Sequence, residues 1–90
     1  MTEKELQELF NKVENTVWDY DTDYYARYTC GNEKWYYNGD DVSSVSFEVE
    51  GFSSKTGMSW TEYWSIDSDG KIYTEDKTYN DFEDFLKDWG

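Results

Sequence analysis

The sequence has 90 residues, and its 21 Asp and Glu against eight Lys and Arg give a net charge of −13 at pH 7. A chain of this length forms one domain with one modest core, and an aromatic content of 21% argues against disorder. A surface this negative repels phosphate and anionic lipid, which excludes direct binding to nucleic acid or to a membrane, and it favours encounter with basic partners. We therefore expect a single acidic domain over residues 1–90.

The compartment is indicated by features that the sequence lacks. A single cysteine, Cys30, cannot form an intramolecular disulfide, which fits a reducing environment. No apolar run approaches the ~18 residues of a membrane span, and the N-terminus does not resemble a signal peptide. The sequence predicts a soluble, cytoplasmic protein.

Two segments have the apolar spacing of amphipathic helices, one at each end of the chain. Near the N-terminus, Thr2 and Glu5 form a capping-box pattern before apolar residues at i, i+3, i+4 and i+7, which are Leu6, Leu9, Phe10 and Val13. Near the C-terminus, Thr78 and Asp81 form a second such pattern before Phe82, Phe85, Leu86 and Trp89. We expect a helix at each of these places.

Between the helices the hydrophobic period changes to two, which predicts strands. The expected strands cover residues 18–30, 34–37, 42–52, 58–66 and 71–74, with turn signals at residues 31–33, 38–39 and 67–70 and a loop at residues 51–57. The order α-β-β-β-β-β-α predicts an α+β domain whose antiparallel sheet of four to five strands is a meander. We expect both helices to cover one face of that sheet and the other face to remain in contact with water.

The residues for common catalytic and metal chemistry are missing. With no His, the usual general base and the commonest metal ligand are absent, and no His could activate Cys30, which we expect to be a buried structural thiol. Residues 19–23 have the alternating acids of a calcium loop, but Tyr24 stands where that loop needs Gly. We expect no catalytic residues, no metal and no cofactor.

Two weaker alternatives remain open. Glu62 lies between Trp60 and Trp64 on an apolar face, where a second nearby carboxylate could form a glycosidase-like pair. The aromatic run at residues 35–37 could stack on a carbohydrate, although most rings are needed for the core.

The acids are grouped in a way that solubility does not require. Asp19, Asp21 and Asp23 alternate along one side of the expected strand 18–30, which spaces their carboxylates roughly 6.5–7 Å apart, close to the through-space spacing of phosphates on one DNA strand. Further acids follow at Asp40, Asp41, Glu48, Glu50, Asp67, Asp69, Glu75 and Asp76. Tyr25 and Tyr36 lie among them and could supply contacts to Arg side chains. We predict that these residues bind a partner by imitating DNA.

In this character the chain resembles the small, acidic, phage-encoded anti-CRISPR proteins and other DNA-mimic inhibitors. The resemblance rests on size, on the absence of a catalytic set, and on acidic stretches at residues 19–23 and 79–85, not on an alignable motif. It implies inhibition of a CRISPR-Cas nuclease in the host bacterial cytoplasm by occlusion of its DNA-binding surface, and it implies no individual contact residues.

Two other functions stay open. The first is an immunity protein that neutralises a basic nuclease toxin, for which the same electrostatic argument holds. The second is a phage regulatory or structural protein that does not mimic DNA.

Overall fold

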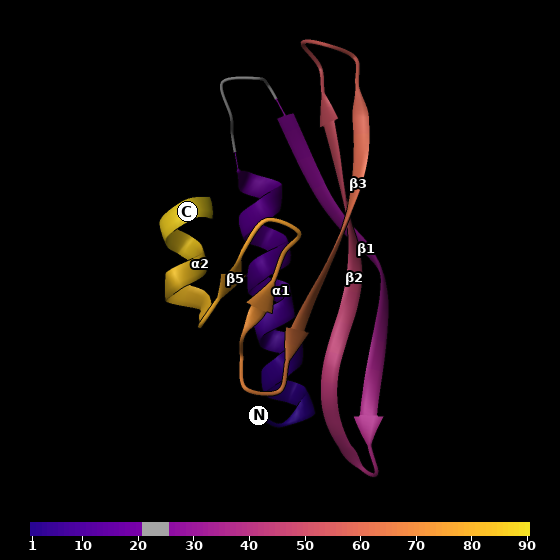
Figure 1. Ribbon diagram of the computed structural model, residues 1–90, viewed down its shortest axis with the longest axis vertical. Coiled ribbons are helices and arrows are strands. Elements are labelled where there is room, and N and C mark those ends of the chain that lie inside the picture. Colours follow the sequence, from indigo (N-terminus) through magenta and orange to yellow (C-terminus); the bar gives the residue numbers. More distant parts are fainter. Residues whose placement is uncertain (21–25) are drawn as a thin grey trace.

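The first helix, α1, spans Glu3–Asp19 and lies along one face of a five-stranded sheet (Figure 1). The computed structural model describes residues 1–20 and 26–90. The expected capping box is confirmed, since the Glu5 amide donates to Thr2 Oγ1 (3.2 Å) and the Thr2 amide donates to Glu5 Oε1 (3.1 Å). The expected apolar stripe is buried.

The prediction of a strand beginning at residue 18 was wrong, because α1 continues to Asp19. Val17 follows Val13 at i+4 and both side chains are fully buried. Val17 thus extends the buried helical stripe by one more residue, and this core contact outweighs the period-two pattern that begins at residue 18. Trp18, the first residue of the expected strand, is 61% exposed.

The strands are β1 (Ala26–Asn38), β2 (Asp41–Ser53), β3 (Ser59–Asp67), β4 (Ile72–Tyr73) and β5 (Thr78–Tyr79). They are antiparallel and neighbour one another in chain order, which confirms the meander. The hairpin at residues 38–39 is also confirmed, because Asn38 pairs with Asp41 around Gly39, whose φ is 66°.

The expected turn at residues 31–33 is instead a bulge within one long strand. Gly31 lies opposite Glu48 and Lys34 lies opposite Ser46, so β1 carries one extra residue there. Asn32 has a φ of 54°, a left-handed conformation that Asn tolerates and that absorbs the extra residue without reversing the chain. Residues 26–30 and 34–37, which were expected in two separate strands, therefore both lie in β1, and β2 extends to Ser53, where a loop was expected.

The core lies between the helices and one face of the sheet. Strand side chains of alternate parity meet α1 there, and the fully buried members of the core include Leu6, Val13, Val17, Val45, Val49, Ile66, Ile72 and Phe85. Edge-to-face ring contacts join Phe10 to Phe47 and Phe47 to Trp64, so aromatic rings pack together within this mainly aliphatic core. The buried indole of Trp64 donates to Glu62 Oε1 (3.2 Å), and the Trp60 indole donates to Glu62 Oε2 (3.2 Å).

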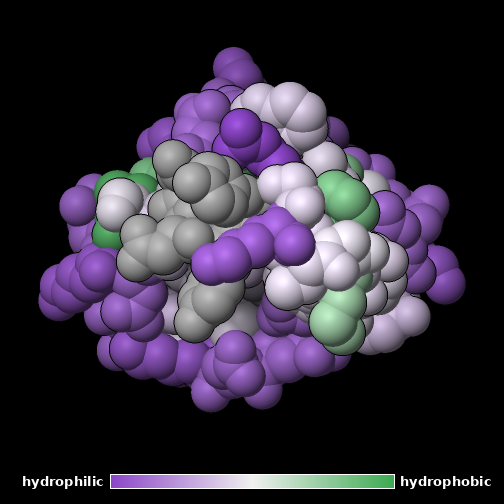
Figure 2. All heavy atoms as spheres, turned by 90° about the horizontal axis from the view of Figure 1, so that it is seen from above, coloured by the Kyte–Doolittle hydropathy of each residue, from purple (hydrophilic) through white to green (hydrophobic). Residues whose placement is uncertain are grey.

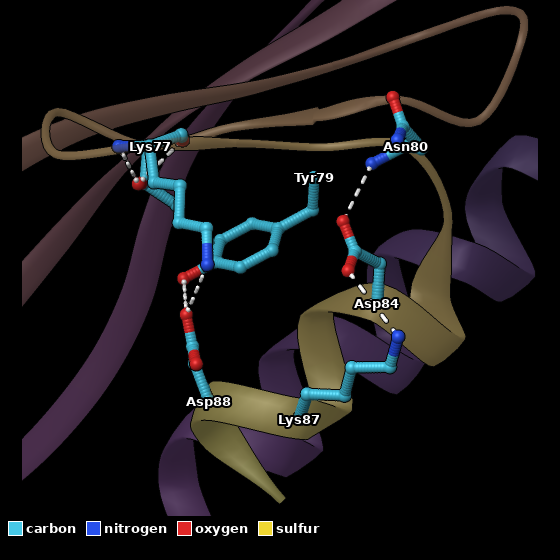
Figure 3. Close-up of polar contacts among 7 residues, drawn as sticks. Lys77, Tyr79, Asn80, Asp84, Lys87 and Asp88 are labelled. Atoms are coloured by element: carbon cyan, nitrogen blue, oxygen red, sulfur yellow. Dashed lines mark hydrogen bonds and ion pairs between the residues drawn. The ribbon is translucent and has the colours of Figure 1, made fainter.

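The second helix, α2 (Phe82–Trp89), covers the same face of the sheet as α1, as expected (Figure 1). Its N-cap is Asp81, whose Oδ1 accepts from the Asp84 amide (2.8 Å). The expected capping box with Thr78 was wrong, because Thr78 belongs to β5. Figure 3 shows how α2 is tied to the strand before it: Asp88 Oδ2 accepts from Lys77 Nζ (3.0 Å) and from the Tyr79 hydroxyl (2.9 Å).

Candidate functional site

The sheet face opposite the two helices, here called the open face, has no layer packed on it in the described part of the chain. Register places side chains from three strands together on it. Glu48 lies between Gly31 and Tyr63, and Glu50 lies between Thr29 and Thr61. The expectation of one covered and one solvent-facing side of the sheet is therefore confirmed.

Three hollows run along the open face and share residues, so they form one trough. The first, of about 310 Å³, lies toward Phe52, the second has about 250 Å³, and the third, of about 160 Å³, lies between Tyr36 and Tyr63. Thr29 and Glu50 line the first two, and residues 32 and 48 line the last two. We call this feature the open-face trough.

The carboxylates of Glu48 and Glu50 lie in the middle of this trough. Glu48 Oε2 accepts from Asn32 Nδ2 (2.6 Å), which fixes the side chain without neutralising it. Arg27 and Lys34 line opposite ends of the trough. Within residues 1–20 and 26–90 the ion pairs are Lys77–Asp88 and Lys87–Asp84, so neither trough carboxylate is paired with a cation. Both can accept hydrogen bonds from an incoming Arg or Lys.

A second group of acids lies at the end of the molecule where the N-terminus is (Figure 1). Asp40 and Asp41 lie at the β1–β2 hairpin, and Asp67 and Asp69 lie in the β3–β4 turn. The turn is held beside β2 by the Ser68 amide, which donates to the Ser43 carbonyl (2.9 Å). The two pairs of acids are thus brought to one end by tertiary structure.

Two of the predicted contact acids also hold the fold. Asp67 Oδ1 accepts from the amides of Asp69 (2.9 Å) and Lys71 (3.0 Å), and its Oδ2 accepts from the Tyr73 hydroxyl (2.8 Å). Glu75 Oε1 accepts from the amide of Tyr63 (3.1 Å) on the edge of β3. Asp69 and Asp76 are exposed.

The predicted acidic strand does not include Asp19. Asp19 is the last residue of α1, exposed at the end of the molecule opposite the Asp40 hairpin. Asp21, Asp23 and Tyr25 lie outside the described residues. The remaining predicted residues form separate groups: the trough acids with Tyr36 beside them, the hairpin and turn acids, and the pair at residues 75–76. They do not form one continuous row.

Figure 2 looks onto the end opposite the N-terminal one. Strongly hydrophilic residues surround it, and paler and hydrophobic residues gather on one side. Exposed apolar side chains near this end include Phe52 and Met58. The surface there differs in character from the end that carries Asp40 and Asp67.

Tyr63 is the contact candidate that the sequence reasoning missed. It is 65% exposed and lines the trough opposite Tyr36. The sequence could have indicated that Tyr63 is exposed. Tyr63 shares alternate positions along the strand with Ser59, Thr61 and Ser65, which the pattern of residues 58–66 places away from the core.

Searches against protein-family models, curated proteins and solved structures find no match to this chain. Among residues 1–20 and 26–90, no helix is long and apolar enough to cross a membrane. The same residues contain no group of three or more Cys, Asp or Glu side chains placed to hold a metal ion. The function has to be inferred from the geometry.

Proposed function

We propose that the protein inhibits a nuclease effector by binding the basic surface with which that effector holds nucleic acid. The inhibitor takes the place of the DNA backbone on this surface. The partner is a basic nucleic-acid-binding protein, and neither nucleic acid nor a membrane is bound directly.

The observation that carries this proposal is the density of charge along the molecule. The long axis is 45 Å and the net charge is −13, which is one negative charge per about 3.5 Å, whereas one DNA strand carries one phosphate per about 3.4 Å. A cationic groove that binds one DNA strand would therefore meet a similar negative charge over a similar length when it binds this protein. Most carboxylates of the described residues lack a cationic partner.

The open-face trough supports the same proposal by its chemistry. Glu48 and Glu50 are two residues apart on β2, so their carboxylates are spaced about 7 Å apart on a rigid sheet. Exposed Tyr36 and Tyr63 stand at one end of the trough, where an Arg guanidinium can stack on a ring. Fixed acids beside aromatic rings suit a surface that normally binds phosphates and bases.

The target that we favour is a CRISPR-Cas nuclease, which is also what the resemblance to small acidic anti-CRISPR proteins implies. Such an effector holds its nucleic acids in a positively charged channel. A basic nuclease toxin would offer a similar surface, so the experiment includes one.

The proposal is tested by adding the purified protein to a panel of guide-loaded Cas nucleases and one basic nuclease toxin, and measuring DNA cleavage and DNA binding. We expect at least one Cas nuclease to lose both, because the inhibitor and DNA compete. Inhibition should weaken with salt, so that the inhibition constant increases at least about tenfold between about 50 and 300 mM salt. Inhibition of the toxin alone would indicate an immunity protein. Inhibition that leaves DNA binding intact, or that is flat with salt, contradicts mimicry.

A matched pair of double variants separates the trough from net charge. Glu48→Gln with Glu50→Gln removes the trough carboxylates, and Glu8→Gln with Glu83→Gln removes two exposed carboxylates from the helices. Both variants have the same net charge. We expect the first to weaken inhibition about tenfold or more and the second to weaken it much less. Equal effects would mean that the trough has no special part in binding.

A further inference from the structure

Strand β1 is an open edge of the sheet. It is the outermost strand, spans 13 residues, and pairs with β2 on one side. No strand in residues 1–20 or 26–90 pairs with its other side. Backbone N–H and C=O groups of residues 27–31 that point away from β2 are therefore free to pair with an added strand.

A hollow of about 420 Å³ lies at this edge. It is lined by Glu14, Asn15 and Trp18 of α1 and by Thr29 and Cys30 of β1. Thr29 faces the open side of the sheet, and Cys30 packs against the core. Because adjacent residues of opposite orientation line it, the hollow lies at the backbone edge itself. We call it the edge groove.

Trp18 is the feature of the edge groove that the fold does not explain. The other large apolar residues of α1 between Leu6 and Val17 are buried, whereas Trp18 is 61% exposed. An exposed Trp beside free backbone groups is typical of a contact that contributes strongly to binding. Its ring also attracts cations more strongly than other aromatic rings do.

The groove is negatively charged. None of the described residues that line it is Lys or Arg, and Glu14 is part of its wall. Burial, with Glu14 and then Glu33 adding to it, raises the pKa of the Cys30 thiol to about 12. Both carboxylates therefore act on the middle of β1, and an occupant with positive charge is favoured.

We propose that the edge groove binds an extended, basic segment of a partner protein, which adds to β1 as a sixth strand. Its backbone pairs with the free edge from Arg27 to Gly31, where β1 is regular before the bulge. Alternate Lys or Arg side chains reach Glu14 and Glu33, and one cation lies over the Trp18 ring. A helix would leave the edge unpaired, and a second copy of this chain would bring another charge of −13 to the same place. This inference does not depend on the identity of the partner as a nuclease.

The test uses a synthetic peptide of about ten residues with Arg and Val alternating. The control peptide has the same charge, with two central Val residues replaced by Pro, which cannot pair as a strand. We expect the first peptide to bind the full-length protein at least about tenfold more tightly and to slow amide hydrogen exchange in residues 27–31. Equal binding of the two peptides, or no binding of either, would overturn the proposal.

Variants with matched controls locate the binding. Trp18→Ala should weaken binding about tenfold, whereas Tyr63→Ala, which removes an equally exposed ring from the open face, should not. Glu14→Gln with Glu33→Gln should weaken binding more than Glu8→Gln with Glu83→Gln, which has the same net charge. If the two members of either pair have equal effects, the site is not the edge groove. Because no nuclease is present, failure here leaves the proposed inhibitor function untouched.

Discussion

Gly51 shows how one residue depends on its surroundings in the fold. The sequence pattern places it at the start of a Ser/Gly-rich loop, but it lies within β2, directly opposite Trp60 of β3. A Cβ atom at Gly51 would overlap the Trp60 indole ring. The glycine is thus required for a close approach between a ring and the backbone, which no local pattern indicates.

We therefore predict that Gly51→Ala destabilises the protein by roughly 1–3 kcal/mol, because the Trp60 ring must move and its hydrogen bond to Glu62 is strained. Gly31→Ala is the matched control, since a Cβ there meets nothing within 4 Å. Urea unfolding of both variants measures the difference. Similar free energies of unfolding for the two variants would contradict the prediction.

The role of the charged residue Glu62 also depends on its neighbours in the fold. The sequence suggested that a carboxyl between two Trp residues could serve as a catalytic acid. In the structure its two oxygens accept hydrogen bonds from the indoles of Trp60 and Trp64. This arrangement satisfies the polar atom of a buried ring, which is a sufficient reason for an acid at that place.

At the scale of elements, the short strand β5 and the helix α2 hold one another in place. Tyr79 of β5 is 3% exposed, and its hydroxyl donates to Asp88 of α2 (2.9 Å). Burial, together with the hydrogen bond to Asp88 and the charge of Asp88, raises the pKa of Tyr79 to about 12. The folded state therefore binds the phenolic proton more tightly than the unfolded state, in which the pKa is near 10.

The stability that Tyr79 contributes is accordingly complete below about pH 10 and is lost as the pH rises from about 10 to about 12. We predict that Tyr79→Phe makes the alkaline loss of stability less steep. Tyr36→Phe on the open face is the control and should leave the slope unchanged. Urea midpoints measured between about pH 8 and 12 test this, and parallel curves for wild type and Tyr79→Phe would contradict it.

At the scale of the whole molecule, the charge works against the fold. A net charge of −13 repels itself, and in the described part of the chain two ion pairs offset it. A cationic partner or dissolved salt relieves this repulsion. The repulsion between surface carboxylates should therefore be smaller in a complex with a cationic partner than in the free protein.

We predict that raising sodium chloride from about 20 to 300 mM stabilises the free protein by roughly 1 kcal/mol, or about 4–8 °C in melting temperature. Salt acts in the opposite direction on the proposed complex, which it should weaken. Thermal unfolding measured by circular dichroism over this range tests the prediction. A melting temperature that falls with salt would show that ion pairs, not repulsion, dominate.

The sequence by itself determined the class of the fold, because the patterns that carry it are local. The capping box at Thr2, the period of 3.6 in both helices and the turn residues at 38–39 and 67–70 each act within a few residues. Net charge and the absence of His also follow directly from composition, and the basic partner that they indicate stays a prediction.

Tertiary structure decided where α1 ends, how β1 is formed and which acids lie together. The period-two pattern assigned residues 18 and 19 to a strand, but they are helical because Val17 packs in the core. Residues 31–33 were expected to form a turn, but they lie within β1 because β2 is long enough to pair with β1 on both sides of them. The grouping of Asp40 with Asp67, the placement of Tyr63 beside Tyr36, and the edge groove beside Trp18 all join residues far apart in the chain. Contacts between distant residues depend on how the helices and strands pack together, and the local sequence pattern of a single element does not specify that packing.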